Sequence, residues 1–389
     1  MYKLISMGSF STPCDPSMVS ILLLVGLLMV SLETTGVQSI GVCYGMLGNN
    51  LPSSREVVDF YKSQNIRRMR IYGPVGAALD ALRGSNIELI VGVPNEILRE
   101  LSRNPAAAQG WVQDNVRNYW PSVKFRYIAV GNEVIPGKLA QFVLPAMRNI
   151  YNAISSSGLR DQVKVSTAIH MGVLEKSYPP SQGSFGGDAN QYLTPIVNYL
   201  ATTGAPLLAN VYPYFSYVGN PKEISLSYAL FTSPSTVVYD GSLQYQNLFD
   251  AMLDALHSAV ERVGGSNVKI VVSESGWPSA GSFAATIENA RIYNSNLIKH
   301  VSTSFHMISP KMQLGSWHGF LLLFLQLSTS FHVIPAKIEV ASLGALDARC
   351  PSKRYVGGAK CMQLYSTDFS HMKFLSFMHY CPTHSSLSF

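Results

Sequence analysis

The sequence predicts an α/β protein that folds as a (β/α)8 TIM barrel, and three observations favour this class. Short apolar runs alternate with amphipathic stretches over residues 39–301. Several runs are almost continuously hydrophobic, which is typical of parallel strands covered on both faces. Polar side chains recur at the carboxyl ends of these runs, where the loops of a barrel ring its active mouth. A doubly wound open sheet is the alternative, but it places its ligand at one switch point and does not need polar residues at nearly every strand end.

Seven strands can be placed in chain order as short apolar runs. They span residues 39–45, 66–73, 87–96, 125–134, 163–171, 206–215 and 268–278. Amphipathic stretches with helical spacing lie between or after them, at residues 54–65, 144–158, 245–265 and 283–301. Closure of the barrel needs an eighth strand, for which residues 331–341 are the best candidate. The weakness of that candidate leaves the barrel at risk of being incomplete at its eighth strand.

The two ends of the chain differ from the barrel region. Residues 18–32 are apolar and precede small and polar residues, as in a secretory signal peptide, whereas the alternative, a transmembrane anchor, needs about 20 apolar residues. Residues 302–389 hold six of the nine histidines, and their apolar run at 320–327 is too short to span a bilayer. We therefore divide the chain into a signal peptide (1–37), a barrel region with seven strands (38–301) and an atypical tail (302–389).

Charge and motif content exclude several classes of function. The net charge of +6 comes mainly from the tail: residues 1–300 contribute +2 (22 basic, 20 acidic) and residues 301–389 contribute +4 (7 basic, 3 acidic). The barrel region therefore lacks the broad basic surface that nucleic-acid binding requires. The chain has neither a glycine-rich phosphate loop nor a Gly-x-Ser-x-Gly elbow, and its cysteines and histidines lack the close pairs of a zinc site. We expect no metal and no nucleic acid as partners.

Two of the predicted strands end on a glutamate, Glu133 in the fourth and Glu274 in the seventh. These strands face one another across the mouth of a barrel, and two carboxylates about 5 Å apart cleave a glycosidic bond with retention, one as general acid and the other as nucleophile. A single glutamate at a barrel rim is more often paired with an arginine. The occurrence of two, with an asparagine beside one and an aromatic turn beside the other, favours catalysis.

The neighbours of the two acids fit a sugar substrate. Asn132 is placed to donate a hydrogen bond to a sugar 2-hydroxyl, with a local turn cap as the alternative. Aromatic residues at strand ends offer rings for stacking on sugars, although each alone is as readily explained by packing. They are Tyr44, Tyr72, Tyr212, Tyr214 and Phe215. We interpret Trp277 as a buttress of the loop that holds Glu274, and His170 as structural.

The segments "IGVCYGMLGNNLPS", "RIYGP", "YIAVGNEV", "NVYPYFSYVGNP" and "VVSESGWPSAG" resemble the plant endo-1,3-β-glucanases of glycoside hydrolase family 17, and the resemblance runs from about residue 38 to 301. It implies a barrel with a long cleft and retaining hydrolysis of internal 1,3-β-glucosidic bonds, without a metal or organic cofactor. The residues that match the family's functional positions are Glu133 as proton donor, Glu274 as nucleophile, and Tyr44, Tyr72, Asn132, Tyr212 and Phe215 in the cleft.

The same resemblance implies a β-glucan partner and a role in defence against fungal walls or in callose turnover. We expect a monomer, secreted to the apoplast or cell wall and free of the membrane once mature, with the vacuole as the alternative location. Preference between 1,3 and mixed 1,3;1,4 linkages stays open, because it depends on the shape of the cleft.

Residues 302–389 depart from the family, because no segment matches its final strand. Their composition resembles translated non-coding or frame-shifted sequence. Without an eighth strand, strands one and seven would keep unpaired edges, which favours aggregation. On this ground we expect poor folding and little or no activity of the chain as written. The alternative function is therefore a glucan-binding barrel without turnover.

Overall fold

A computed structural model describes residues 40–48, 51–303 and 321–323, and all of them belong to one compact unit. The predicted signal peptide and most of the predicted tail lie outside the described residues. So does the segment 331–341, which was the best sequence candidate for the eighth strand. Among the helices of the described part, none has the length and apolarity needed to cross a bilayer.

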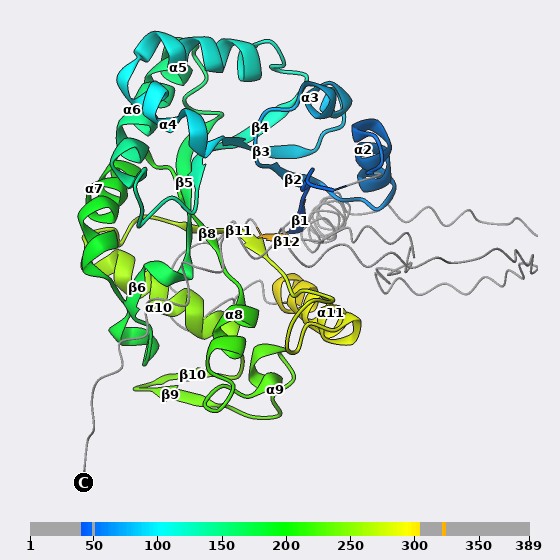
Figure 1. The fold of residues 1–389 in the computed structure, drawn as a ribbon, viewed down its shortest axis with the longest axis vertical. Coiled ribbons are helices and arrows are strands. Elements are labelled where there is room, and N and C mark those ends of the chain that lie inside the picture. The colour runs from blue at the N-terminus through cyan, green and yellow to red at the C-terminus, as the bar shows by residue number, and fades with distance from the viewer. Residues whose placement is uncertain (1–39, 49–50, 304–320, 324–389) are drawn as a thin grey trace, which may run out of the picture. The chain divides into compact units, whose positions relative to one another are not determined.

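The described residues form a closed parallel barrel, which confirms the predicted fold class (Figure 1). Its strands follow the order β1-β12-β11-β8-β5-β4-β3-β2 around the barrel. Their bounds are β1 (Ile40–Cys43), β2 (Arg68–Ile71), β3 (Glu88–Val93), β4 (Lys124–Asn132), β5 (Lys164–His170), β8 (Leu207–Asn210), β11 (Ile270–Ser275) and β12 (Leu321–Leu323). Each of the first seven lies within a strand predicted from the sequence, except that β4 begins one residue earlier, at Lys124.

The eighth position is filled by β12, which comes from the apolar run at 320–327. Leu321 pairs with Ile40 of β1 and with Val272 of β11, so both neighbours have a parallel partner there. A run of leucines suits this position, because strands of a parallel barrel are covered on both faces and do not need alternating polarity. At three residues β12 is the shortest strand of the barrel, and its ladder with β11 is irregular.

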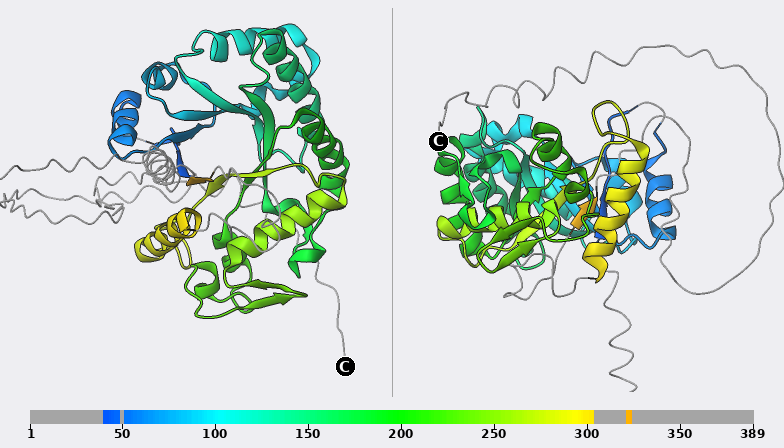
Figure 2. Two further views of the ribbon diagram at one scale, coloured as in Figure 1. Left: turned by 180° about the vertical axis from the view of Figure 1, so that it is seen from behind. Right: turned by 90° about the horizontal axis from the view of Figure 1, so that it is seen from below.

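Helices lie on the outside of the ring of strands (Figures 1 and 2). They are α2 (Ser54–Ser63), α3 (Gly76–Leu82), α4 (Leu98–Arg103), α5 (Pro105–Val112) with the π-turn η2 (Gln113–Arg117), α6 (Ala140–Ser156), α7 (Gly187–Thr203), α10 (Leu248–Arg262) and α11 (Ile287–Thr303). The sequence shows why α2 begins where it does: Ser53 accepts a hydrogen bond from the Glu56 amide, and the Glu56 carboxylate accepts one from the Ser53 amide. This capping box satisfies N–H groups that a helix start leaves unpaired.

Small elements lie in the loops that follow β3, β5 and β8, and the sequence did not predict them. They are the short helices η1 (Asn95–Ile97), η3 (Met171–Val173), η4 (Pro180–Gln182), α8 (Pro213–Gly219) and α9 (Leu226–Ala229), with the hairpins β6–β7 (Leu174–Lys176, Ser184–Phe185) and β9–β10 (Val238–Asp240, Leu243–Tyr245). Of these, η1 follows β3. The two hairpins are antiparallel and separate from the barrel sheet.

The apolar core has two parts. The larger cluster packs the strands against the helices, and the smaller one fills the inside of the barrel. The inner cluster consists of Cys43, Ile90, Tyr127, Ala129, Ala168, Leu208 and Val271, with Tyr72 packed against it. Because these buried residues fill the barrel interior, the polar groups at the carboxyl ends of the strands lie on an apolar layer.

Candidate functional site

Both predicted acids lie just beyond an irregularity in the strand ladder. The pairing of β4 with β5 shifts between Ala129 and Asn132, and the pairing of β11 with β8 shifts between Val272 and Glu274. A bulge adds a residue to one strand, which breaks the strict alternation of side chains and re-aims those that follow. Glu274 is accordingly buried at the end of β11, with 6% of its surface exposed.

The backbone at Glu133 is in the left-handed region. Gly131 has φ 77° and Glu133 has φ 53°, a conformation uncommon for residues other than glycine. A Cβ atom on Gly131 would lie 2.9 Å from Val134 Cγ2 and 3.1 Å from Leu98 Cδ1, so the position requires glycine. The Glu133 amide donates a 2.8 Å hydrogen bond to the Ala168 carbonyl, which ties this turn to β5. The strained backbone is thus held from a neighbouring strand.

Arg70 of β2 lies at the centre of the site, with 1% of its surface exposed. Its Nη1 donates to Asn210 Oδ1 and to the Ser273 carbonyl, both at 3.0 Å, and its Nη2 donates to Asn132 Oδ1 at 2.8 Å. Nη1 also lies 3.0 Å from Glu274 Oε1. Both hydrogens of Nη1 are used in the bonds to Asn210 and to the Ser273 carbonyl, so the contact with Glu274 is an ion pair without a hydrogen bond. Glu274 Oε1 accordingly accepts no hydrogen bond of ordinary geometry from the residues that the structure describes.

Asn210 connects the two acids. Its Nδ2 donates to Glu133 Oε1 at 2.8 Å and to Asn132 Oδ1 at 3.0 Å. Its Oδ1 accepts from Arg70 and, at 2.8 Å, from the Ser273 hydroxyl. A continuous path of polar contacts therefore runs from Glu133 through Asn210 and Arg70 to Glu274.

The surroundings of Glu274 shift the pKa of its carboxyl group. Burial raises its pKa above the ordinary value of 4.5, the positive charge of Arg70 opposes this, and the negative charge of Glu133 adds to it. The Tyr212 hydroxyl donates a 2.8 Å hydrogen bond to Oε2, which also favours the carboxylate. Arg70 itself stays charged: burial is the largest single influence and disfavours the cation, but Glu274 and the neighbouring Tyr72, Cys43 and Tyr212 together outweigh it and raise the Arg70 pKa.

Asn132 is oriented by its neighbours. Its Oδ1 accepts hydrogen bonds from both Arg70 and Asn210. Because the Arg70 guanidinium can only donate hydrogen bonds, the oxygen of the Asn132 side chain must face Arg70 and the Nδ2 group must point away from it. Asn95, the first residue of η1, accepts a 2.8 Å hydrogen bond from the backbone amide of Asn132 through its side-chain oxygen and donates a 3.0 Å hydrogen bond to the Asn132 carbonyl. These contacts leave the side-chain Nδ2 of Asn132 as a donor for another molecule.

Tyr72 and Tyr212 line the approach to Glu274. The Tyr72 hydroxyl is buried near Cys43 and Glu274 without a hydrogen bond of ordinary geometry, and the Arg70 guanidinium lies 4.8 Å from its ring centroid. Burial raises the pKa of Tyr72, and it raises the pKa of the neighbouring Cys43 thiol to about 12. Tyr212 touches Phe215 edge to face at 5.6 Å, and Phe215 is 52% exposed.

Three other predicted positions have local roles in the structure. The Tyr44 hydroxyl lies 3.5 Å from Ser54 Oγ, in the apolar cluster between the barrel and the helices. His170 accepts from the Gly172 amide at 3.0 Å and caps η3. Trp277 is buried, donates to the Ala284 carbonyl at 2.9 Å and packs on Tyr214 and Tyr293, as a buttress of its loop would.

Arg70 and Asn210 were not singled out from the sequence. A signal for both was present, because each lies two residues before a predicted cleft tyrosine in the same strand, Tyr72 and Tyr212. Residues two apart in a strand face the same side. The polar character of these inward positions is thus readable, whereas their partners depend on closure of the barrel.

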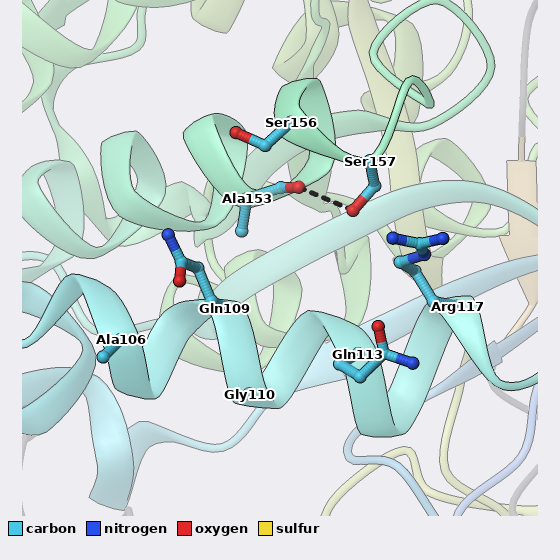
Figure 3. A pocket seen from close by; sticks show the side chains of 8 residues that line it. All are labelled: Ala106, Gln109, Gly110, Gln113, Arg117, Ala153, Ser156 and Ser157. Carbon is cyan, nitrogen blue, oxygen red and sulfur yellow. Dashed lines mark hydrogen bonds between the residues drawn. The ribbon is translucent and has the colours of Figure 1, made fainter.

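A surface hollow of about 470 Å³ lies elsewhere, between α5–η2 and the end of α6 (Figure 3). It is lined by Ala106, Gln109, Gly110, Gln113, Arg117, Ala153, Ser156 and Ser157. None of these residues belongs to the strand-end site. Within residues 40–48, 51–303 and 321–323, no group of three or more metal-ligating side chains converges.

Comparisons with known proteins show the family of this chain. A glucan endo-1,3-beta-glucosidase of Vitis vinifera is 60% identical over 285 residues, covering 72% of this chain and 83% of the relative. A basic vacuolar isoform from Nicotiana plumbaginifolia is 57% identical over 291 residues, covering 73% and 80%. A solved beta-1,3-glucanase and pollen allergen of Cryptomeria japonica superposes with a TM-score of 0.70 at 47% identity, covering 74% and 89%. The model for glycosyl hydrolases family 17 matches residues 40–312, and the chain belongs to this family.

Proposed function

We propose that this protein hydrolyses internal 1,3-β-glucosidic bonds of β-glucans with retention of configuration. The observation that carries the proposal is the joining of two glutamates from the ends of β4 and β11, Glu133 and Glu274, through Asn210 and Arg70. Paired carboxylates of different environment suit the two roles in this reaction. The names of the Vitis and Cryptomeria relatives support the choice of the 1,3 linkage.

In the proposed first step, Glu133 gives its proton to the glycosidic oxygen while the bond from that oxygen to C1 breaks. A Glu274 oxygen bonds to C1 at the same time, and the leaving sugar departs as an alcohol. In the second step, the Glu133 carboxylate takes a proton from water, whose oxygen bonds to C1 and releases Glu274. Glu274 must be charged in the first step, and the contacts with Arg70 and Tyr212 favour that state.

The same proposal assigns substrate contacts. The Nδ2 group of Asn132 donates to the sugar 2-hydroxyl, a contact that strengthens as positive charge develops at C1. The exposed ring of Phe215 stacks on a sugar face. Tyr212 and Tyr72 place their hydroxyls beside Glu274, where they contact substrate hydroxyls. Tyr44, which follows β1, is a further contact for the sugar.

The proposed setting is that of a monomeric, secreted enzyme of the apoplast or cell wall, free of the membrane once mature, which acts in defence against fungal walls or in callose turnover. The vacuole is the alternative location, and the name of the Nicotiana relative supports it. Fluorescence of the full chain fused to a reporter in plant cells, with and without residues 1–37, tests the location.

The function is tested with the full chain on laminarin, following the anomeric configuration of the first products by NMR. We expect retained configuration, and loss of about 10⁴-fold or more in kcat for Glu274→Gln. Glu288→Gln is a matched control, since Glu288 is an exposed glutamate of α11 that forms a surface ion pair with Arg291. Inverted products, or activity that survives Glu274→Gln, would contradict the proposal.

A second reading, glucan binding without turnover, is motivated by the short strand β12. Sedimentation with insoluble 1,3-β-glucan, measured beside hydrolysis, separates the two. Binding with no products from the folded chain supports the second reading. Comparison of laminarin with barley mixed-linkage glucan then decides the linkage.

A further inference from the structure

Asn210 lies in the interior of the site, with 1% of its surface exposed, and all its hydrogen-bonding capacity is used by the protein. Its Nδ2 donates twice and its Oδ1 accepts twice. A side chain so enclosed has no group left for a substrate. Its effect on the reaction must therefore pass through its partners, of which Glu133 is one.

The orientation of the Asn210 amide is fixed by chemistry. Arg70 can only donate hydrogen bonds, so the group that it contacts must be the oxygen, Oδ1. The Ser273 hydroxyl donates to the same oxygen at 2.8 Å. The amide nitrogen is consequently turned toward Glu133, 2.8 Å from Oε1.

Glu133 Oε1 uses a lone pair to accept the hydrogen bond from Asn210 Nδ2. A proton bound to Oε1 would compete with that hydrogen bond and would repel the Asn210 amide hydrogen. We propose that Asn210 is a positioning residue that assigns the transferable proton of Glu133 to Oε2. This inference rests on the proposed function of Glu133 as general acid. Arg70 thereby aligns both catalytic groups: it pairs with Glu274 directly and fixes the Glu133 proton through Asn210.

The proton on Oε2 moves to the glycosidic oxygen, the C1–O bond breaks, Glu274 bonds to C1, and the electron pair left on Glu133 is held by the Asn210 N–H at Oε1. If Asn210 cannot donate, the proton is distributed over both oxygens, or is shared with residue 210. Protonation of a poor leaving group then becomes inefficient, whereas a leaving group that needs no proton is unaffected.

The experiment compares Asn210→Asp and Asn210→Ala with the unchanged full chain on two substrates. One is laminarin, and the other is 2,4-dinitrophenyl β-laminaribioside, whose phenolate leaves without a proton. We expect kcat/KM on laminarin to fall by about 10²-fold or more in both variants, and to fall by less than about threefold on the dinitrophenyl substrate. The loss should be larger for Asn210→Asp, because a carboxylate in that place repels Glu133.

Asn149→Ala is the control for a lost buried amide. The Asn149 Nδ2 donates to the carbonyls of Leu101 and Ser102 on the helix side of the barrel, so both substrates should be turned over as in the parent. Equal losses on the two substrates in the Asn210 variants, or a benign Asn210→Asp, would show a merely structural role and overturn the proposal.

A readout without turnover separates this inference from the proposed function. The carboxyl carbon of Glu133, identified in ¹³C-glutamate-labelled protein by its absence in Glu133→Gln, is titrated by NMR. Its titration should move to higher pH in Asn210→Asp and Asn210→Ala and stay in place in Asn149→Ala. If the parent does not cleave laminarin, the proposed function fails while this titration still decides the role of Asn210; an unmoved titration overturns that role.

Discussion

The Tyr212 hydroxyl donates a 2.8 Å hydrogen bond to the Glu274 carboxylate, and this bond lowers a pKa that burial raises. Tyr212→Phe should therefore raise the Glu274 pKa further and move the acid limb of kcat/KM on laminarin to higher pH. The folded state then holds a proton that the unfolded chain loses near pH 4.5, so stability falls as pH rises from that value through the folded pKa. A limb that stays in place or moves to lower pH would contradict this account.

Tyr245→Phe is the matched control. The Tyr245 hydroxyl donates a 2.8 Å hydrogen bond to Asp254, away from both acids. Its loss should lower the free energy of unfolding by about 1 kcal/mol and leave the pH profile of activity unchanged.

Arg70 and Glu274 form a buried ion pair whose disruption leaves a charge without compensation. Arg70→Met should lower the free energy of unfolding by about 3 kcal/mol near pH 7, measured with urea, and abolish activity. Adding Glu274→Gln should recover a large part of this stability but none of the activity, because the uncompensated charge is gone. Additive losses in the double variant would show that the pair is not coupled.

Two bulged strands, β4 and β11, act as elements that aim the acids, and Gly131 is the point in β4 where this can be tested. Gly131→Ala should lower the free energy of unfolding by about 1–2 kcal/mol and reduce kcat at least about tenfold, because the new Cβ displaces the turn that carries Glu133. Gly158→Ala is the control: its φ is 73°, but a Cβ there meets nothing within 4 Å. Gly158→Ala should lower the free energy of unfolding, because alanine is strained at this φ, but it should leave kcat unchanged. Equal losses of kcat in the two variants would refute the role of the bulge.

At the scale of the whole molecule, closure depends on β12. A chain ending at Thr303 removes β12 and leaves β1 and β11 each with an unpaired edge, so it should aggregate and lose activity. A chain ending at Phe331 keeps the whole first compact unit and should remain monomeric and active. Size-exclusion chromatography and laminarin hydrolysis of the two chains provide the measurement. A soluble, active shorter chain would show that β12 is dispensable.

The barrel and the two acids were predictable because strand periodicity and the residues at strand ends are local properties of the sequence. Local reasoning also placed Tyr72, Tyr212 and Asn132, which the structure brings around Arg70 and Glu274. The link through Asn210 was not predictable, since its partners come from β2, β4 and β11 and meet only when the barrel forms. The eighth strand was assigned to residues 331–341 instead of 320–327, because a three-residue run of leucines carries no periodicity of its own.

The pairing of β1 with β12 has a consequence for synthesis on the ribosome. Ile40 finds its partner Leu321 only after almost the whole described chain has been made. At roughly 5–20 residues per second, the outer edge of β1 is exposed for tens of seconds. Until then the nascent barrel is an open sheet, so translation speed and holdase chaperones set the yield of closed protein, and slow codons between these two strands should lower it.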